Sequence, residues 1–131
     1  MKEVIILPTY NERENIGPLI EEIFLLLPKI HILVVDDNSP DETAAVVKEL
    51  QAQYSYLSLL ERPMKNGLGG AYIEAFKKIL ADNEVENIIM MDADFSHNPK
   101  YLFQIIAEAE NYGLVIGSRY IKGGGIAKWE L

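Results

Sequence analysis

The stretch Ile32-Leu33-Val34-Val35-Asp36-Asp37-Asn38-Ser39 joins four consecutive apolar residues directly to two aspartates. Apolar runs without polar alternation are typical of strands buried on both faces, as in a parallel sheet. Similar runs occupy residues 4–7, 88–91 and 114–116, and a weaker one, interrupted by a serine, occupies residues 57–60. The chain is therefore predicted to contain five strands.

Between these runs, apolar residues recur at steps of three and four, the pattern of a helix with one buried face. The segments with this pattern are residues 16–27, 44–50, 71–79 and 102–109. Ser39, Pro40 and Glu42 have the spacing of a capping box, so the second helix is predicted to begin near Pro40. Regular alternation of strands and helices predicts an α/β, Rossmann-like, mostly parallel sheet with helices on both faces, in a single domain over residues 1–131.

Composition excludes several functions for this chain of 131 residues. It has no cysteine, so disulfides and thiolate metal sites are excluded, and any metal must be held by oxygen or imidazole. The 20 acidic and 12 basic residues give a formal net charge of −8. Such a balance disfavours nucleic acid as a partner and a polybasic membrane anchor, since both need a basic surface.

The carboxyl ends of parallel strands meet at one edge of a sheet, and ligands of such sheets bind beyond that edge. The run at residues 88–91 is followed by Asp92-Ala93-Asp94, two carboxylates that flank one small residue. Both can reach one divalent cation, and ligation by oxygen alone suits Mg²⁺ or Mn²⁺, which also take phosphate oxygens of a substrate. A solvated acidic turn is the plainer explanation, but a second acidic strand end nearby favours a metal site.

Other strand ends also carry candidate binding groups. Asp36 and Asp37 can accept hydrogen bonds from a ribose hydroxyl or a base N–H, or simply complement the dipole of the next helix. Lys65 opens the glycine-rich segment 65–70, where a lysine and a helix N-terminus attract phosphate, although a plain turn fits equally well. Arg119 follows the last run and can grip an acceptor or donor phosphate, or form a surface ion pair.

Five motifs can now be taken together in their order along the chain. They are Pro8-Thr9-Tyr10-Asn11-Glu12, Val34-Val35-Asp36-Asp37-Asn38-Ser39-Pro40-Asp41, Gly67-Leu68-Gly69-Gly70-Ala71-Tyr72, Met91-Asp92-Ala93-Asp94-Phe95-Ser96-His97 and Gly117-Ser118-Arg119-Tyr120. Together they resemble family 2 glycosyltransferases across residues 4–129, and most closely the dolichol-phosphate (polyprenol-phosphate) mannosyltransferases. The resemblance is more specific for the family than for mannose.

The resemblance implies a GT-A nucleotide-diphospho-sugar transferase fold. It also implies transfer of a hexose, mannose from GDP-mannose, to a polyprenyl (dolichyl) phosphate with inversion. Asp92 and Asp94 would hold Mg²⁺ or Mn²⁺ against the diphosphate, with Ser96 beside the metal, and Arg119 would receive the acceptor phosphate. That phosphate is already ionised, so no strong general base is needed and Asp94 and Arg119 are the expected catalytic residues. The donor residues expected from the motifs and strand ends are Pro8, Tyr10, Glu12, Asp36, Asp37, Lys65, Gly67, Asp92 and Ala93.

Family members continue for roughly another half domain, so this chain is expected to be truncated at its C-terminus, with an incomplete sheet. The missing part is expected to supply peripheral contact with the cytoplasmic face of a membrane. Truncation would also expose a sheet edge or an apolar patch, through which copies of the chain could associate into a homo-oligomer. Trp129 is a weak sign of a membrane interface.

Three alternatives stay open. A sibling transferase would use UDP-glucose or another donor, and a donor-binding fragment would bind the nucleotide sugar without turnover. A receiver-type signalling module is the least favoured alternative. A receiver's paired acids follow its first strand, whereas here a complete strand–helix unit precedes Asp36, and the last run ends in Gly117-Ser118-Arg119 instead of a lysine.

Overall fold

The computed structural model describes residues 2–125, so Trp129 lies outside the described residues. The chain divides into two units, Met1–Lys100 and Tyr101–Leu131. The first contains β1 (Lys2–Thr9), α1 (Arg13–Leu26), β2 (His31–Asp36), α2 (Thr43–Gln51), β3 (Leu57–Glu61), α3 (Gly67–Ile79) and β4 (Val85–Met90). A short 3₁₀ turn, η1 (Pro99–Tyr101), precedes α4 (Leu102–Ala109) in the second unit. No helix within residues 2–125 is both long and apolar enough to cross a membrane.

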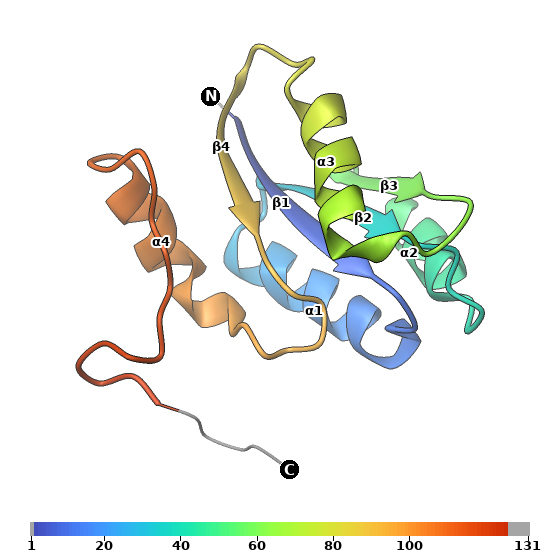
Figure 1. Cartoon of the computed structure of the whole chain (residues 1–131), viewed down its shortest axis with the longest axis horizontal. Helices are drawn as coiled ribbons and strands as arrows, with labels where there is room; N and C mark the ends of the chain where they lie inside the picture. Colours follow the sequence, from blue (N-terminus) through green and yellow to red (C-terminus); the bar gives the residue numbers. More distant parts are fainter. Residues whose placement is uncertain (1, 126–131) are drawn as a thin grey trace. The chain divides into compact units, whose positions relative to one another are not determined.

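The four strands form one parallel sheet in the order β3-β2-β1-β4 (Figure 1). The weak run at residues 57–60 is confirmed as a strand, β3. The chain adds β2 and β3 on one side of β1 and then returns through α3 to place β4 on the other side. Where the strand order reverses in this way, connections leave neighbouring strands toward opposite faces, and a crevice opens at the carboxyl edge.

Both faces of the sheet are covered, which explains why its strands lack polar alternation. Alternate residues of a strand point to opposite faces. One set from β1 and β2 packs with α3 in a buried cluster of Val4, Ile6, Leu33, Val35, Ala71, Tyr72, Ala75 and Ile79. The intervening residues, Ile5, Leu7, Ile32 and Val34, are equally buried and point to the face covered by α1 and α2 (Figure 1).

The predicted strand at residues 114–116 is wrong. These residues form no strand in the described part of the chain, and Leu114 and Ile116 are 77% and 75% exposed. The run is three residues long and lies between Gly113 and Gly117, which favour irregular backbone. So short a run becomes a strand only when a neighbour pairs with it, and the sequence does not show whether one does.

The predicted start of the second helix is also wrong. α2 begins at Thr43, and Glu42 precedes it with a left-handed backbone, φ 66°. The Ser39 hydroxyl makes no capping bond; it donates to Asp36 and accepts from the Asn11 amide. The capping-box spacing was misleading because Ser39 has partners on two other segments, which local pattern does not reveal.

Pro8 ends the pairing between β1 and β4. Ile6 O accepts from Met91 N at 3.2 Å, and the next rung toward β4 would need an N–H from Pro8, which proline lacks. On the other side of β1, Thr9 O accepts from Asp37 N at 3.1 Å. Pairing with β2 therefore continues to the end of β1, pairing with β4 stops at Ile6, and the carboxyl edge opens between β1 and β4.

Arg62 follows β3 directly and is a buried cation at this edge. Its guanidinium lies 3.0 Å from Asp37 Oδ1 and 3.5 Å from Glu74 Oε1 of α3. The side chains of Arg62 and Asp37 are 4% and 8% exposed, so each charge depends on the other for compensation. Gly70 allows this approach, because a Cβ there would lie 2.8 Å from Arg62 Nη2. The pair thus ties the ends of β2 and β3 to α3.

We expect Arg62→Met to lower the free energy of unfolding by about 3–5 kcal/mol, because it leaves the Asp37 charge buried without a partner. Lys48→Met is the matched control. It removes an exposed ion pair to Glu61, at the end of the same strand, and should cost less than about 1 kcal/mol. Urea denaturation followed by circular dichroism measures both. Equal losses would contradict this account, and Arg62→Met/Asp37→Leu should recover much of the loss.

Two neighbouring glycines of α3 test the same packing. A Cβ at Gly69 meets nothing within 4 Å, so Gly69→Ala should raise the melting temperature, since alanine is favoured over glycine in a helix by about 0.5–1 kcal/mol. Gly70→Ala should show no such gain, or a loss, because its Cβ collides with Arg62. Thermal unfolding compares them, and an equal rise in both would show that Arg62 is not held against α3.

Candidate functional site

The candidate site lies at the carboxyl edge of the sheet, where three strands end in register. Thr9 pairs with Asp36, and Asp36 pairs with Glu61. β4 pairs with β1 as far as Ile6, through Met90 and the Met91 amide, and Asp92 follows directly after this end of the ladder. The predicted convergence of polar strand ends in the first unit is thus observed.

Three loops at this edge hold a non-glycine residue in the left-handed region. Such residues cost about 1–3 kcal/mol and persist only where their surroundings fix them, although asparagine tolerates the region better than most. They are Asn11 after β1 (φ 56°), Asn38 after β2 (φ 55°) and Phe95 after β4 (φ 64°). The loops around the site therefore have defined backbone shapes.

The acidic pair after β2 is compensated from within the protein. Asp36 is 1% exposed, and its carboxylate accepts from Thr9 Oγ1 at 2.7 Å, Ser39 Oγ at 2.6 Å and Ser39 N at 3.0 Å. Asp37 is neutralised by Arg62. Sequence reasoning gave Arg62 no role; the available signal was one basic residue directly after a strand whose neighbour ends in two aspartates.

The structure brings Tyr10 and Lys65 together, although they are far apart in the sequence. Lys65 Nζ lies 4.2 Å from the centroid of the Tyr10 ring, a cation–π contact between the loop after β1 and the start of α3. Glu12 lies in the same loop and accepts from Asn15 Nδ2 at 2.9 Å. Gly67 begins α3 with φ 76°, a backbone that glycine adopts without strain. Two predicted donor residues, Tyr10 and Lys65, therefore meet just before the N-terminus of α3, where Gly67 begins the helix.

The turn after β4 presents Asp92 and Asp94 on either side of the buried Ala93. Asp94 Oδ1 accepts from the Ser96 hydroxyl at 2.6 Å and the Ser96 amide at 3.0 Å. The hydroxyl bond, opposed by partial burial, holds the pKa of Asp94 below its ordinary value, so this carboxylate is ionised at neutral pH. The Asp92 amide donates to His97 Nδ1 at 3.0 Å, which closes the turn.

Tyr72 of α3 is close enough to the turn after β4 for the charge of Asp92 to affect its pKa. Burial raises the pKa of Tyr72 to about 12, and the negative charge of Asp92 acts in the same direction. Its hydroxyl is therefore neutral and protonated at any physiological pH. Arg119 belongs to the second unit, where its Cζ lies 5.5 Å from the centroid of the Tyr120 ring.

The groups at Asp92 and Asp94 fit a hard divalent cation. Their ligands are carboxylate oxygens, the Asp92 side chain is 45% exposed, and two hydrogen bonds do not saturate the lone pairs of Asp94. Within residues 2–125, no group of three or more His, Asp or Glu side chains is arranged to hold a metal ion. Mg²⁺ and similar ions commonly bind through one or two carboxylates and complete their shell with water and substrate phosphate. An acidic edge of this kind can accept a phosphate that arrives with such a cation.

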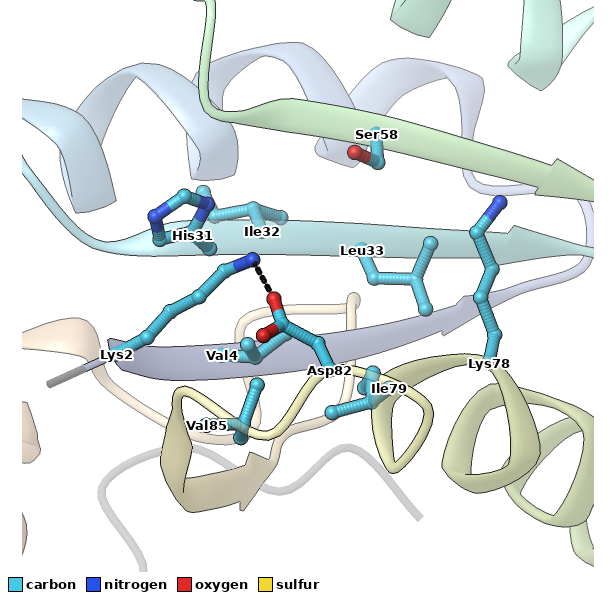
Figure 2. A pocket seen from close by; sticks show the side chains of 10 residues that line it. All are labelled: Lys2, Val4, His31, Ile32, Leu33, Ser58, Lys78, Ile79, Asp82 and Val85. Atoms are coloured by element: carbon cyan, nitrogen blue, oxygen red, sulfur yellow. Dashed lines mark hydrogen bonds and ion pairs between the residues drawn. The ribbon is translucent and has the colours of Figure 1, made fainter.

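A surface pocket of about 130 Å³ lies at the opposite, amino edge of the sheet (Figure 2). It is lined by the starts of β1 and β2, the end of α3 and Asp82, whose Oδ2 lies 2.6 Å from Lys2 Nζ. The predicted site residues that the structure describes are absent from its lining. The candidate site is therefore a convergence of strand ends, separate from this pocket.

Two relatives are similar to nearly all of this chain. It is 40% identical over 131 residues to the polyprenol monophosphomannose synthase of Mycolicibacterium smegmatis. It is 39% identical over 132 residues to the dolichol-phosphate mannosyltransferase of Pyrococcus furiosus. Both alignments cover 98% of this chain but only 49% and 36% of the relatives, so the chain spans half or less of their length.

Solved structures are also similar to it. The mannosyltransferase PcManGT of Pyrobaculum calidifontis, in complex with GDP-Man and Mn²⁺, has a TM-score of 0.61 at 25% identity over 71% of this chain and 27% of that one. The structure of S. aureus TarS (residues 1–349) has a TM-score of 0.66 at 24% identity over 86% of this chain and 33% of that one. These likenesses confirm the predicted GT-A fold. The model of the family described as Glycosyl transferase family 2 matches residues 4–131, and this chain therefore belongs to glycosyl transferase family 2.

Proposed function

We propose that this chain forms the donor-binding part of an inverting transferase that moves mannose from GDP-mannose to a polyprenyl (dolichyl) phosphate. The observation that carries the proposal is the exposed pair Asp92 and Asp94, at the edge where β1 and β4 separate. The two relatives named as polyprenol-phosphate and dolichol-phosphate mannose enzymes support the sugar and the acceptor. The PcManGT complex supports the donor and the metal.

The donor would lie across the loops after β1 and β2 and the start of α3. Pro8 opens the edge, and Tyr10 and Glu12 bind the nucleoside. Lys65 and Gly67 face the diphosphate at the helix N-terminus, which attracts anions. Asp36 and Asp37 contribute chiefly by fixing the loop after β2, because their carboxylates already bond to Thr9, Ser39 and Arg62.

Asp92 and Asp94 would hold Mg²⁺ or Mn²⁺ beside the donor diphosphate. When bound, this ion supplies positive charge that stabilises the diphosphate as a leaving group. Ser96 keeps Asp94 oriented and ionised through its two hydrogen bonds. Ala93, which is 3% exposed, anchors the turn between the two carboxylates. Through this turn it would lie against the donor.

Arg119 would receive the acceptor phosphate, since a guanidinium can bind it with two parallel hydrogen bonds. The acceptor phosphate is ionised at neutral pH, so positioning and charge replace a strong general base. Because the acceptor is linked to a lipid, the transfer would take place at a membrane surface, and we propose the cytoplasmic face of that membrane. Residues 1–131 would act together as one nucleotide-sugar-binding domain, with association into a homo-oligomer as a further proposal.

We expect the chain to bind GDP-mannose in the presence of Mn²⁺, and to bind at least about tenfold more weakly without the ion or after Asp92→Ala/Asp94→Ala, because the diphosphate then meets an uncompensated acidic edge. Asp82→Ala/Glu84→Ala is the matched control, because it changes the net charge equally at the amino edge of the sheet. Isothermal titration calorimetry measures all three proteins, and circular dichroism confirms that each is folded.

Preference for UDP-glucose over GDP-mannose in the same titrations would move the proposal to a sibling specificity. Undiminished, metal-independent binding by the Asp92→Ala/Asp94→Ala variant would refute the proposed site.

A further inference from the structure

Three consecutive backbone amides after β1 are each bound by a side chain from the segment before and at the start of α2. The Asn11 amide donates to Ser39 Oγ at 2.9 Å, the Glu12 amide to Thr43 Oγ1 at 3.1 Å and the Arg13 amide to Asp41 Oδ2 at 3.1 Å. We call Ser39, Asp41 and Thr43 the amide clasp. The clasp holds the backbone of the loop that presents Tyr10 and Glu12.

The Glu12 and Arg13 amides lie at the N-terminus of α1, where N–H groups have no partner within the helix, and the Asn11 amide directly precedes them. A helix usually satisfies one of them with the side chain of its own N-cap residue. Here the N-cap residue is Glu12, and its side chain makes no capping bond. The Glu12 and Arg13 amides are bound instead by Thr43 and Asp41 of a different segment, and the shape of the loop depends on that segment.

The clasp is rigid in its own right. Asp41 Oδ1 accepts from both the amide and the hydroxyl of Thr43, and Thr43 is fully buried. Burial acts to raise the pKa of Asp41, but hydrogen bonds from Thr43 and Arg13 outweigh it and hold that pKa below its ordinary value. Asp41 is thus a charged acceptor at neutral pH, and hydrogen bonds to charged acceptors are stronger than neutral ones.

The clasp is also connected to the sheet. Ser39 Oγ donates to Asp36, and Asp36 accepts in turn from Thr9 at the end of β1. Both ends of the loop after β1 are therefore fixed, by Thr9 at its start and by Arg13 at its end. Between them Asn11 has a left-handed backbone, which asparagine tolerates better than most residues.

We propose that Thr43 and Asp41 are positioning residues for the donor site, which hold the loop of Tyr10 and Glu12 in the shape that binds the nucleoside. This inference rests on the proposed function. The clasp residues need not touch the donor, because they act through backbone amides. Loss of one clasp bond should therefore weaken donor binding beyond what an equal loss of stability causes elsewhere in α2.

Thr43→Val and Thr43→Ser test this role with GDP and Mn²⁺ as the probe. Valine keeps the shape of Thr43 but removes the hydroxyl that binds the Glu12 amide, so GDP should bind about tenfold more weakly. Serine keeps the hydroxyl and should restore binding to within a few-fold of wild type. Val47→Ala is the control, because Val47 is fully buried in the same helix and makes no clasp bond.

Calorimetry gives the dissociation constant for GDP, thermal unfolding gives stability, and amide hydrogen exchange reports the Glu12 N–H directly. We expect Thr43→Val to weaken GDP binding and to speed exchange at Glu12, and Val47→Ala to lower stability with neither effect. Equal GDP binding by wild type and a folded Thr43→Val chain would overturn the role of the clasp. Absence of GDP binding by the wild-type chain is a different result, which overturns the proposed function and the inference with it.

Discussion

Pro8 has no backbone N–H, and the lack of this hydrogen-bond donor determines where strand pairing stops at the carboxyl edge of the sheet. β1 stays paired with β2 through Thr9, but its ladder with β4 stops at Ile6, where the next rung would need a proline N–H. The separation falls where the strand order reverses, the place where open α/β sheets bind ligands. The loops carrying Tyr10 and Asp92 follow the central strand β1 and its neighbour β4, the edge strand, so both loops leave the sheet at this point.

The carboxylates at this edge fall into two groups, those with partners inside the protein and those accessible to a ligand. The chain has a net charge of −8, and carboxylates gather at one edge. Those after β2 are buried and satisfied, Asp37 by Arg62 and Asp36 by hydroxyl and amide donors. Those after β4 stay accessible to solvent, with hydrogen bonds that orient Asp94 without neutralising it. Burying charge without compensation is costly, which explains the partners of Asp36 and Asp37. The Asp92 side chain is 45% exposed, with His97 Nε2 at 3.7 Å from its Oδ2, so the pair after β4 is the one accessible to an external cation.

Much of this could be read from the sequence, because strands buried on both faces leave long apolar runs and amphipathic helices leave a period near 3.6. The predictions that were wrong, and the contacts that were not predicted, depend on interactions between distant segments of the chain. The run at 114–116 lacks a strand partner within residues 2–125, the Ser39 hydroxyl bonds to Asp36 and Asn11, and Arg62 is buried against Asp37 and Gly70. Asp41 stood out in the sequence only as part of a motif, whereas its role in holding α1 emerges once α1 and α2 lie side by side. Residue types in the sequence predicted which strand ends carry polar and charged side chains. The fold determined which of those side chains already have a hydrogen-bond or ion-pair partner within the protein.

The most direct test of the central claim, that the donor and its metal bind where β1 and β4 separate, is paramagnetic relaxation by Mn²⁺ in the presence of GDP. Amide signals of the ¹⁵N-labelled chain are recorded before and after the ion is added. We expect selective loss of signals from residues 92–97 and 10–12, while signals of His31, Asp82 and Val85 around the amino-edge pocket persist. Loss confined to that pocket, with the strand-end loops unaffected, would contradict it.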